Sequence, residues 1–308
     1  MSDLTAAWWA RPSGFTSRVW AARSVRIEPG STAPRIVLFG DPDTLRRDSA
    51  AEWGATRDAI RALEERGVAV VLWGNETRSQ MEVIQRDLDL HHPFVSETGA
   101  GLFVPNGYFD DQLVVGRVAP NYRVVDFGKP YYQVAEALHE VARKVGVEII
   151  AFSDMSIQEV AEHCNLSLSQ ARLAKMREYD EPFRMLDSEP ATYSRVCGAL
   201  RRLGLRCFTH EALHHTTGVA DKAQSLRLLA SLYRQAADGQ VLTVGLAKAR
   251  SETCLLQAVD VPVVVQSSTA DAARLGRKVP TARFTSTDDP QSWCDAVLQL
   301  TNGHSSAR

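Results

Sequence analysis

The sequence predicts an α/β protein whose Rossmann-like parallel sheet is interrupted by an inserted α+β unit. Short apolar runs alternate with amphipathic stretches from residue 35 to about residue 104, the pattern changes over about 116–208, and the alternation resumes at about residue 217. Strands that alternate with helices form parallel sheets with right-handed crossovers. We therefore expect a core made of residues 35–115 and 209–301, interrupted by an inserted domain of residues 116–208.

The strands of the core are expected where mostly apolar residues run together, because parallel strands are buried on both faces. The runs that meet this criterion are 36–39, 68–73, 240–244 and 261–265. Helices are expected between the strands. The first of them carries Ile60 and Leu63 on its inner face and ends at Gly67, and the others span about 77–88, 221–237, 251–258 and 290–300.

The inserted domain has a pattern of its own. Strands are expected at 122–127, 149–152 and 206–209, and helices at 131–144, from Asp154 to Val160 and from near Ser167. The helix 131–144 has a clear apolar stripe, which is typical of a helix that packs on another element. The insert is therefore expected to fold as a separate α+β unit.

Composition limits the classes of function. The chain has 308 residues, of which 44% are apolar, and a formal net charge of −2. This charge gives no electrostatic argument for nucleic acid or an anionic membrane, and no apolar run approaches the ~18 residues of a membrane span. Five cysteines without a CxxC pair favour a reducing compartment over a disulfide framework. We expect a cytoplasmic protein that binds neither nucleic acid nor membrane.

Both ends of the chain differ from the rest. Residues 1–34 contain Trp8, Trp9 and Trp20 together with four arginines, and they end in a linker-like stretch. Two interpretations stay open, an arm that lays its aromatic side chains on the domain or a segment that docks a protein partner, since Trp and Arg are typical interface anchors. Residues 302–308 are polar and expected to be disordered.

Two acidic residues follow the first predicted strand, in the run Asp41-Pro42-Asp43-Thr44. In open parallel sheets, ligands bind beyond the carboxyl ends of the strands. Carboxylates at positions i and i+2 can point into one crevice, where one can attack phosphorus and the other can handle the proton of the leaving group. An ordinary Asp-Pro-Asp turn would look the same, so this motif alone leaves both interpretations open.

The order of several motifs along residues 35–300 is more specific than any one of them. These motifs are 36–45, Thr77-Arg78, 92–97, 152–156, 177–183, Asp221-Lys222 and 258–266. In this order they resemble the mannosyl-3-phosphoglycerate phosphatase family of the haloacid dehalogenase (HAD) superfamily. The resemblance implies a Rossmann-like HAD core with an inserted α+β cap domain, and a phosphorylated sugar or glycerate as the ligand.

The resemblance also implies roles for individual residues. Asp41 would be the nucleophile that forms an aspartyl-phosphate, Asp43 the general acid and base, and Lys222 the cation that neutralises the nucleophile and the phosphate. A solvated lysine at the start of a helix is the alternative for Lys222. The loop after Asp41 is one residue shorter than in the family, because the family's glycine is missing, and this puts the placement of Thr44 as a substrate-binding residue in question.

This chain departs from the family pattern in two regions of the site. Gly74 stands where the family has a Thr or Ser that donates to the phosphate, and Asn75 is the candidate substitute. After the strand 240–244 the family has aspartates that hold Mg²⁺, whereas this chain has Lys248 and Glu252 at those positions.

The candidate metal ligands that remain are Asp41, Asp43 and Glu252. Mg²⁺ prefers octahedral oxygen ligands, usually including carboxylates. An ammonium group ~4 Å from the ion would repel it by several kcal/mol in a partly desolvated site. We therefore expect binding of Mg²⁺ to be weak or lost, and Lys222, Lys248 and Arg250 to offer positive charges to a phosphate instead.

Two polar clusters lie in or beside the insert. By resemblance, Arg177, Glu178 and Asp180, with Glu181 beside them, reach the substrate and confer specificity for a sugar-glycerate phosphate. The alternative is a solvated helix end that stops before Pro182. The segment from His210 to His214 matches HExxH, which forms a zinc site only on a helix, but a predicted strand runs into it. Surface histidines between a strand and a loop are therefore expected there.

Two functions from different classes follow. One is a phosphatase that hydrolyses a sugar-phosphate monoester through an aspartyl-phosphate, with weakened turnover. The other is an inactive relative, a pseudophosphatase that acts as a sugar-phosphate-binding protein or as a partner or regulatory subunit. The pairing of Asp41, Asp43 and Lys222 favours the first function, and Gly74 and Lys248 favour the second.

Overall fold

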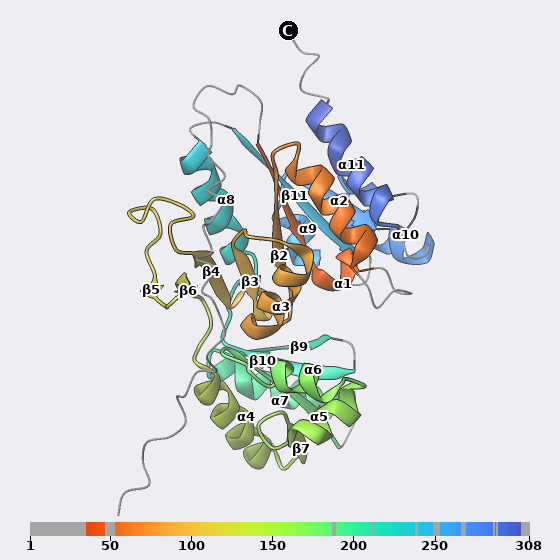
Figure 1. The fold of residues 1–308 in the computed structure, drawn as a ribbon. Helices are drawn as coiled ribbons and strands as arrows, with labels where there is room; N and C mark the ends of the chain where they lie inside the picture. Colours follow the sequence, from red (N-terminus) through yellow and green to blue (C-terminus); the bar gives the residue numbers. More distant parts are fainter. Residues whose placement is uncertain are drawn as a thin grey trace, which may run out of the picture.

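The computed structural model describes residues 35–46, 53–186, 189–210, 212–237, 240–248, 253–265, 269–285, 287 and 289–302. These residues form two lobes, a larger core and a smaller cap (Figure 1). The interpretations of residues 1–34 and 303–308 concern segments outside the described residues. No helix in the described part of the chain is long and apolar enough to cross a bilayer.

The core is built on a nine-stranded sheet in the order β13-β12-β11-β1-β2-β3-β4-β6-β5. Its parallel strands are β1 (Arg35–Gly40), β2 (Val68–Trp73), β3 (Phe94–Ser96), β11 (Val241–Lys248), β12 (Val261–Val265) and β13 (Arg283–Phe284). An antiparallel extension follows, made of β4 (Gly101–Pro105), β6 (Tyr122–Asp126) and β5 (Arg117–Val118). The predicted parallel α/β core is confirmed, and its four long apolar runs are the central strands.

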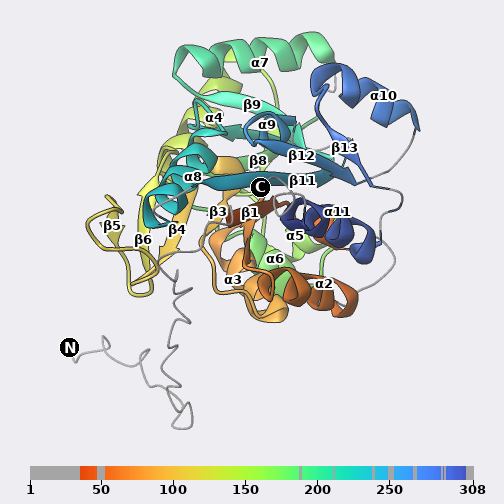
Figure 2. The ribbon, with the colours of Figure 1, turned by 90° about the horizontal axis from the view of Figure 1, so that it is seen from above.

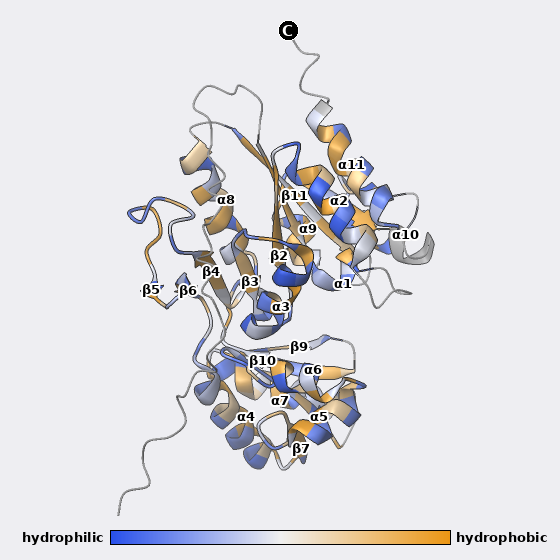
Figure 3. Ribbon diagram, viewed as in Figure 1, coloured by the Kyte–Doolittle hydropathy of each residue, from blue (hydrophilic) through white to orange (hydrophobic). Residues whose placement is uncertain are grey.

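Helices cover both faces of this sheet, as the crossover rule requires. One face carries α2 (Gly54–Glu64), α3 (Arg78–Leu88) and α11 (Pro290–Asn302), and the other carries α8 (Gln224–Ala237), α9 (Thr253–Gln257) and α10 (Thr269–Lys278) (Figure 2). Side chains alternate along a strand, so Ile36 and Leu38 pack with the first set of helices, whereas Val37 and Phe39 pack with the second. The central strands are accordingly hydrophobic along their length (Figure 3).

The cap is an α+β unit with a four-stranded antiparallel sheet in the order β7-β8-β10-β9. Its strands are β7 (Ile149–Ala151), β8 (Asp180–Met185), β9 (Arg206–His210) and β10 (Leu213–Thr217). Its helices are α4 (Tyr131–Val145), α5 (Ile157–Cys164), α6 (Leu168–Ala174) and α7 (Pro190–Arg202). The cap has hydrophobic clusters separate from those of the core.

The boundaries between the lobes differ from those expected. Strands β5 and β6 belong to the core sheet, because Tyr122–Asp126 pairs with β4, and the whole β9–β10 hairpin belongs to the cap sheet. If each strand is assigned to the lobe whose sheet it joins, the cap spans the residues after Asp126 up to Thr217. Its two connections to the core run side by side, since a side chain at Gly218 would lie 2.7 Å from the backbone nitrogen of Lys129.

Candidate active site

Asp41 directly follows β1 and caps a one-turn helix, α1 (Pro42–Leu45), where a loop was expected. Its Oδ2 accepts hydrogen bonds from the backbone N–H of Thr44 (3.1 Å) and from Thr44 Oγ1 (2.9 Å). The backbone N–H of Lys248 donates to the same hydroxyl oxygen at 3.0 Å. Thr44 is therefore held beside Asp41 and the end of β11, even though the loop is one residue shorter than in the family.

The end of β11 also lies beside Asp41. The register pairs Gly40 with Leu246, and β11 continues through Lys248, four residues beyond the expected end of this strand. Lys248 thus stands at the carboxyl edge of the sheet next to the Asp41 turn. Arg250 and Glu252, predicted as a phosphate contact and a metal ligand, lie outside the described residues.

A cavity of about 330 Å³ lies between the core and the cap. Asp43, Asn75 and Glu76 line it from the core. Three basic side chains line it from the cap, namely Arg177, His210 and His215. Its size is in the range of sites for small molecules. Acidic side chains of the core and Arg177 of the cap therefore border one space of a size that fits a small ligand.

Glu76 lines the cavity and fills the space beside Gly74. Burial and the charges of Asp43 and Asp41 raise the pKa of Glu76 well above its usual value. A side-chain carbon at Gly74 would lie 2.2 Å from Glu76 Oε2. Asn75, the expected substitute donor, instead accepts from Thr98 Oγ1 at 3.2 Å through its Oδ1. The sequence patterns did not indicate Glu76, because only the fold brings it to Asp41 and Asp43.

Lys222 is oriented by the cap. Its Nζ lies 3.5 Å from the centroid of the Phe208 ring, a cation–π contact, and its charge acts on Asp180 and His215. Among the described residues, Lys222 forms no ion pair with Asp41 or Asp43. The structure thus brings Asp41, Asp43 and Thr44 together with Lys248, whereas the side chain of Lys222 contacts Phe208 of the cap.

The segment around Asp180 is not a solvated helix end. Asp180 begins β8, is completely buried and accepts from Arg177 Nη1 (2.6 Å) and His215 Nδ1 (2.8 Å). Arg177 Nη1 also donates to the backbone oxygen of Asn75 at 2.9 Å, which links cap and core. Glu178 turns away from the cavity and pairs with Arg78 at 2.8 Å. Of the three residues expected to meet the substrate, only Arg177 lines the cavity.

Glu97 joins the two lobes and was not among the predicted site residues. It lies in the turn η1 (Glu97–Gly99) with a positive φ of 48° and is 1% exposed. Its carboxyl oxygens accept the backbone N–H groups of residues 178 (2.9 Å), 179 (2.8 Å) and 180 (2.9 Å). Burial and the nearby Asp180 raise the pKa of Glu97 to about 8. Burial also raises the pKa of Asp180, whereas the charge of Arg177 lowers it.

The histidines of the HExxH match lie on the β9–β10 hairpin, which rules out the helix of a zinc protease. The strand expected to run into this segment is confirmed by β9, but the expectation of surface histidines beside a loop is wrong, because His214 lies in β10 and both histidines are half-buried. His210 nevertheless lines the cavity, as does His215, which is nearly buried. Burial and the charge of Arg177 lower the pKa of His215 well below its usual value, so this ring is neutral where it meets Asp180.

The described residues do not form a site that fits Mg²⁺. No group of three or more carboxylate, histidine or cysteine side chains among them could hold a metal ion. The Asp41 carboxylate accepts two hydrogen bonds from Thr44, and Lys248 ends the strand where the family has a carboxylate. A hard divalent cation needs several oxygen ligands, which this part of the chain does not supply.

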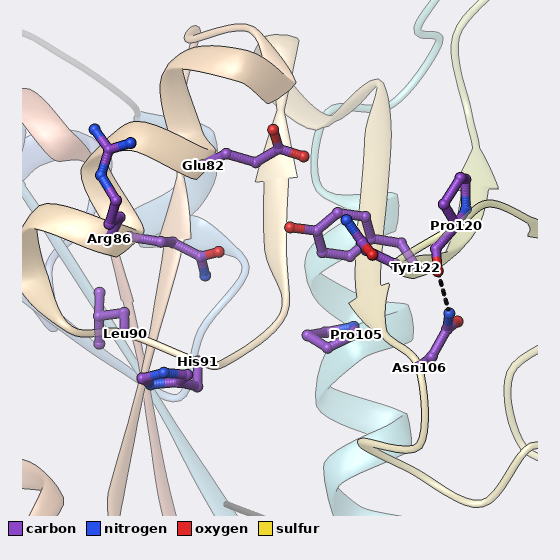
Figure 4. Close-up of a pocket in the computed structure, with 10 residues that line it drawn as sticks. Glu82, Arg86, Leu90, His91, Pro105, Asn106, Pro120 and Tyr122 are labelled. Carbon is purple, nitrogen blue, oxygen red and sulfur yellow. Dashed lines mark hydrogen bonds between the residues drawn. The ribbon is translucent and has the colours of Figure 1, made fainter. Parts of the chain in front are cut away.

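A second cavity of about 510 Å³ lies on the core, between the outer side of α3 and the β4 and β6 strands. Figure 4 shows Glu82 and Tyr122 directed toward each other across it, with Pro105 and Asn106 below. Burial raises the pKa of Glu82. None of the predicted site residues lines this cavity, so it is separate from the site at the strand ends.

Solved structures share this fold. A phosphatase of the haloalkanoate (HAD) enzyme superfamily from Bacteroides thetaiotaomicron aligns with a TM-score of 0.59 and 16% identity over 88% of this chain and 97% of that one. A HAD subclass IIB sugar phosphatase aligns with a TM-score of 0.56 and 13% identity over 86% and 98%. The fold is therefore that of HAD phosphatases.

Curated relatives are closer in sequence. A glucosyl-3-phosphoglycerate/mannosyl-3-phosphoglycerate phosphatase of Methanococcoides burtonii is 33% identical over 231 residues, which are 75% of this chain and 84% of the relative. A protein of the same description from Persephonella marina is 25% identical over 232 residues, with the same coverage of 75% and 84%. No family model matches the chain. The identity and coverage of the first relative confirm the predicted resemblance, and the chain belongs to the glucosyl-3-phosphoglycerate/mannosyl-3-phosphoglycerate phosphatase family.

Proposed function

We propose that the protein binds a glycosyl-3-phosphoglycerate or a related sugar-phosphate monoester in the cavity between core and cap, and hydrolyses it slowly through Asp41. One observation carries this proposal. Thr44 fixes the buried Asp41 carboxylate at the carboxyl end of β1, two residues before Asp43, which lines the cavity. The names of the relatives supply the class of substrate.

The chemistry uses the two aspartates in turn. A carboxylate oxygen of Asp41 attacks phosphorus, the ester P–O bond breaks, and Asp43 gives a proton to the departing sugar or glycerate oxygen. Asp43 then takes a proton from a water molecule, whose oxygen attacks the phosphorus of the aspartyl-phosphate. This step releases inorganic phosphate and regenerates the Asp41 carboxylate.

Slow turnover is expected because the charge of the phosphoryl group is poorly neutralised. In phosphoryl transfer, most of the catalytic effect comes from positioning and from positive charge near the transferred group. The described residues do not fit a divalent cation. We assign this part to Lys248, which ends β11, to Arg250, two residues later in the sequence, and to Lys222.

The test is a phosphatase assay with glucosyl-3-phosphoglycerate, with and without Mg²⁺, in wild type and Asp41→Asn. We expect low activity in wild type and a loss of about a thousandfold or more in the variant, because the nucleophile is removed. Urea unfolding of both proteins checks that the variant is folded. Equal activity in the two proteins would exclude Asp41 as the nucleophile.

A second candidate function is binding without turnover, and the position of Lys248 favours it. An ammonium group at the end of β11 stands where the family's metal-binding carboxylate would be. We expect Lys248→Asp to create or raise Mg²⁺-dependent phosphatase activity, because it returns a ligand and removes a repelling charge. If wild type already turns over well with Mg²⁺ and Lys248→Asp lowers the rate, the inactive candidate is excluded.

A further inference from the structure

The space beside Gly74 is filled by the carboxyl group of Glu76. A side-chain carbon built on Gly74 would lie 2.2 Å from Glu76 Oε2 and 2.9 Å from Cδ of Pro42. Real side-chain carbons do not approach other atoms so closely, so a larger residue at position 74 would require Glu76 to move. The glycine and the glutamate are therefore complementary, and the oxygen of Glu76 stands where a side chain at position 74 would carry its own.

Backbone bonds hold Glu76 in this place. The N–H of Glu97 donates to the backbone oxygen of Glu76 at 3.0 Å, and the N–H of Thr98 donates to that of Gly74 at 2.7 Å. The side chain lines the cavity between core and cap. Its Oε2 is buried and has no hydrogen-bond partner among the described residues. A buried polar atom without a partner in a fixed position is a costly feature, which a bound ligand would relieve.

The surroundings favour the protonated form of this group. Burial and the charges of Asp43 and Asp41 hold its pKa well above the usual value, and a protonated carboxyl group can donate one hydrogen bond. Next to two carboxylates, a hydrogen-bond donor can contact a phosphate oxygen without the charge repulsion that a third carboxylate would cause. Asn75 lines the same cavity, with its amide oxygen and its backbone oxygen engaged by Thr98 and Arg177, and its amide N–H₂ group is a second candidate donor.

We propose that Glu76 supplies the hydrogen-bond donor to the phosphoryl group of the bound monoester, in place of the hydroxyl that Gly74 lacks. Glu76 is then a substrate-binding residue produced by a paired exchange at positions 74 and 76. This inference rests on the proposed function, since it assumes that a phosphomonoester binds beside Asp41.

The experiment is isothermal titration calorimetry with glucosyl-3-phosphoglycerate, with every variant made in the Asp41→Asn protein so that turnover does not disturb binding. We expect Glu76→Ala to weaken binding about ten- to hundredfold, the range for a hydrogen bond to a charged group. Glu76→Gln keeps a donor of the same shape and should bind within a fewfold of the parent, roughly the scatter of conservative changes. Glu82→Ala, on the opposite side of α3, is the matched control and should leave binding unchanged.

A double variant tests the exchange itself. Gly74→Thr with Glu76→Ala returns a hydroxyl to position 74 and removes the clash, and it should regain affinity over Glu76→Ala alone. If Glu76→Ala binds like the parent, or if Glu76→Gln loses as much affinity as Glu76→Ala, the inference is overturned while the proposed function stands. If the Asp41→Asn protein binds no phosphomonoester and wild type shows no turnover, the proposed function itself fails.

Discussion

At the scale of single residues, the site residues that the sequence predicts are those that belong to a short motif next to a recognisable strand. Asp41, Asp43 and Thr44 follow an apolar strand directly, so their position could be predicted without knowledge of the fold. Glu76 and Glu97 carry no such signal. Their importance depends on partners that the fold brings to them, in the case of Glu97 the amides of residues more than eighty positions away.

Glu97 leads to a prediction about pH. A carboxyl group whose pKa is raised to about 8 by burial and Asp180 stabilises the fold while it is protonated. Its unfolded pKa lies near 4.5, so this contribution is fully present below that pH and is lost as pH rises through 8. We expect the free energy of unfolding to fall between pH 6 and pH 8 by up to about 1.4 kcal/mol per pH unit. Urea unfolding at several pH values measures this slope.

The control for this prediction is Glu97→Gln, which cannot titrate. Its side chain loses acceptors for the cap amides and should lower stability at every pH, but it should remove the slope due to residue 97. The comparison is needed because the hydrogen bond from Cys207 lowers the pKa of Cys197 from 9.0 to about 7, and this thiol makes stability rise with pH between those two values, opposite in sign to residue 97. An equal slope in wild type and Glu97→Gln would show that residue 97 does not titrate there.

At the scale of elements, the strands with continuous apolar runs could be predicted, and those defined by long-range pairing could not. β5 and β6 were assigned to the insert because their partner, β4, is separated from them by a loop whose length says nothing of the pairing. β8 was read as a possible helix end because Asp180 and Glu181 are charged. Both are fully buried in the folded protein, which a pattern of hydrophobicity cannot anticipate.

The start of α3 offers a test at this scale. Thr77 and Gln80 form a capping box, in which each side chain accepts from the backbone N–H of the other. Thr77 Oγ1 also donates to the backbone oxygen of Leu173 in the cap at 2.9 Å. Thr77→Ala should lower the free energy of unfolding by about 1–2 kcal/mol, since an N-cap and a second bond are lost. Thr77→Ser keeps the hydroxyl, and an equal loss of stability in both variants would contradict this explanation.

At the scale of the whole molecule, the two-lobed arrangement followed from the interruption in the strand–helix alternation, although the limits of the cap did not. The carboxyl ends of β1, β2 and β11 face the cap, so the motifs of the core meet those of the insert across one cavity (Figure 1).

The first 34 residues lead to a prediction about the molecule as a unit. β1 begins at Arg35 and lies between β11 and β2, so the described sheet is complete without them. We propose that this segment docks a protein partner, and we expect its deletion to change the melting temperature by less than about 2 °C. Calorimetric melting of full-length and truncated protein measures this. Unfolding on truncation would instead support an arm that packs on the domain.

The bonds between the lobes gather in one short stretch of the cap. Leu173, Arg177 and residues 178–180 make them, and the two chain crossings run beside each other. The cavity is also lined by Arg46 and Trp53 of the core and by Leu166 and Gln170 of the cap. Because a domain rotates about the point at which it is held, we expect the cap to tilt about residues 173–180. The core and the cap would then separate between Trp53 and Leu166. A large glycoside could then enter past Trp53 while Arg177 keeps its hydrogen bond to the backbone oxygen of Asn75.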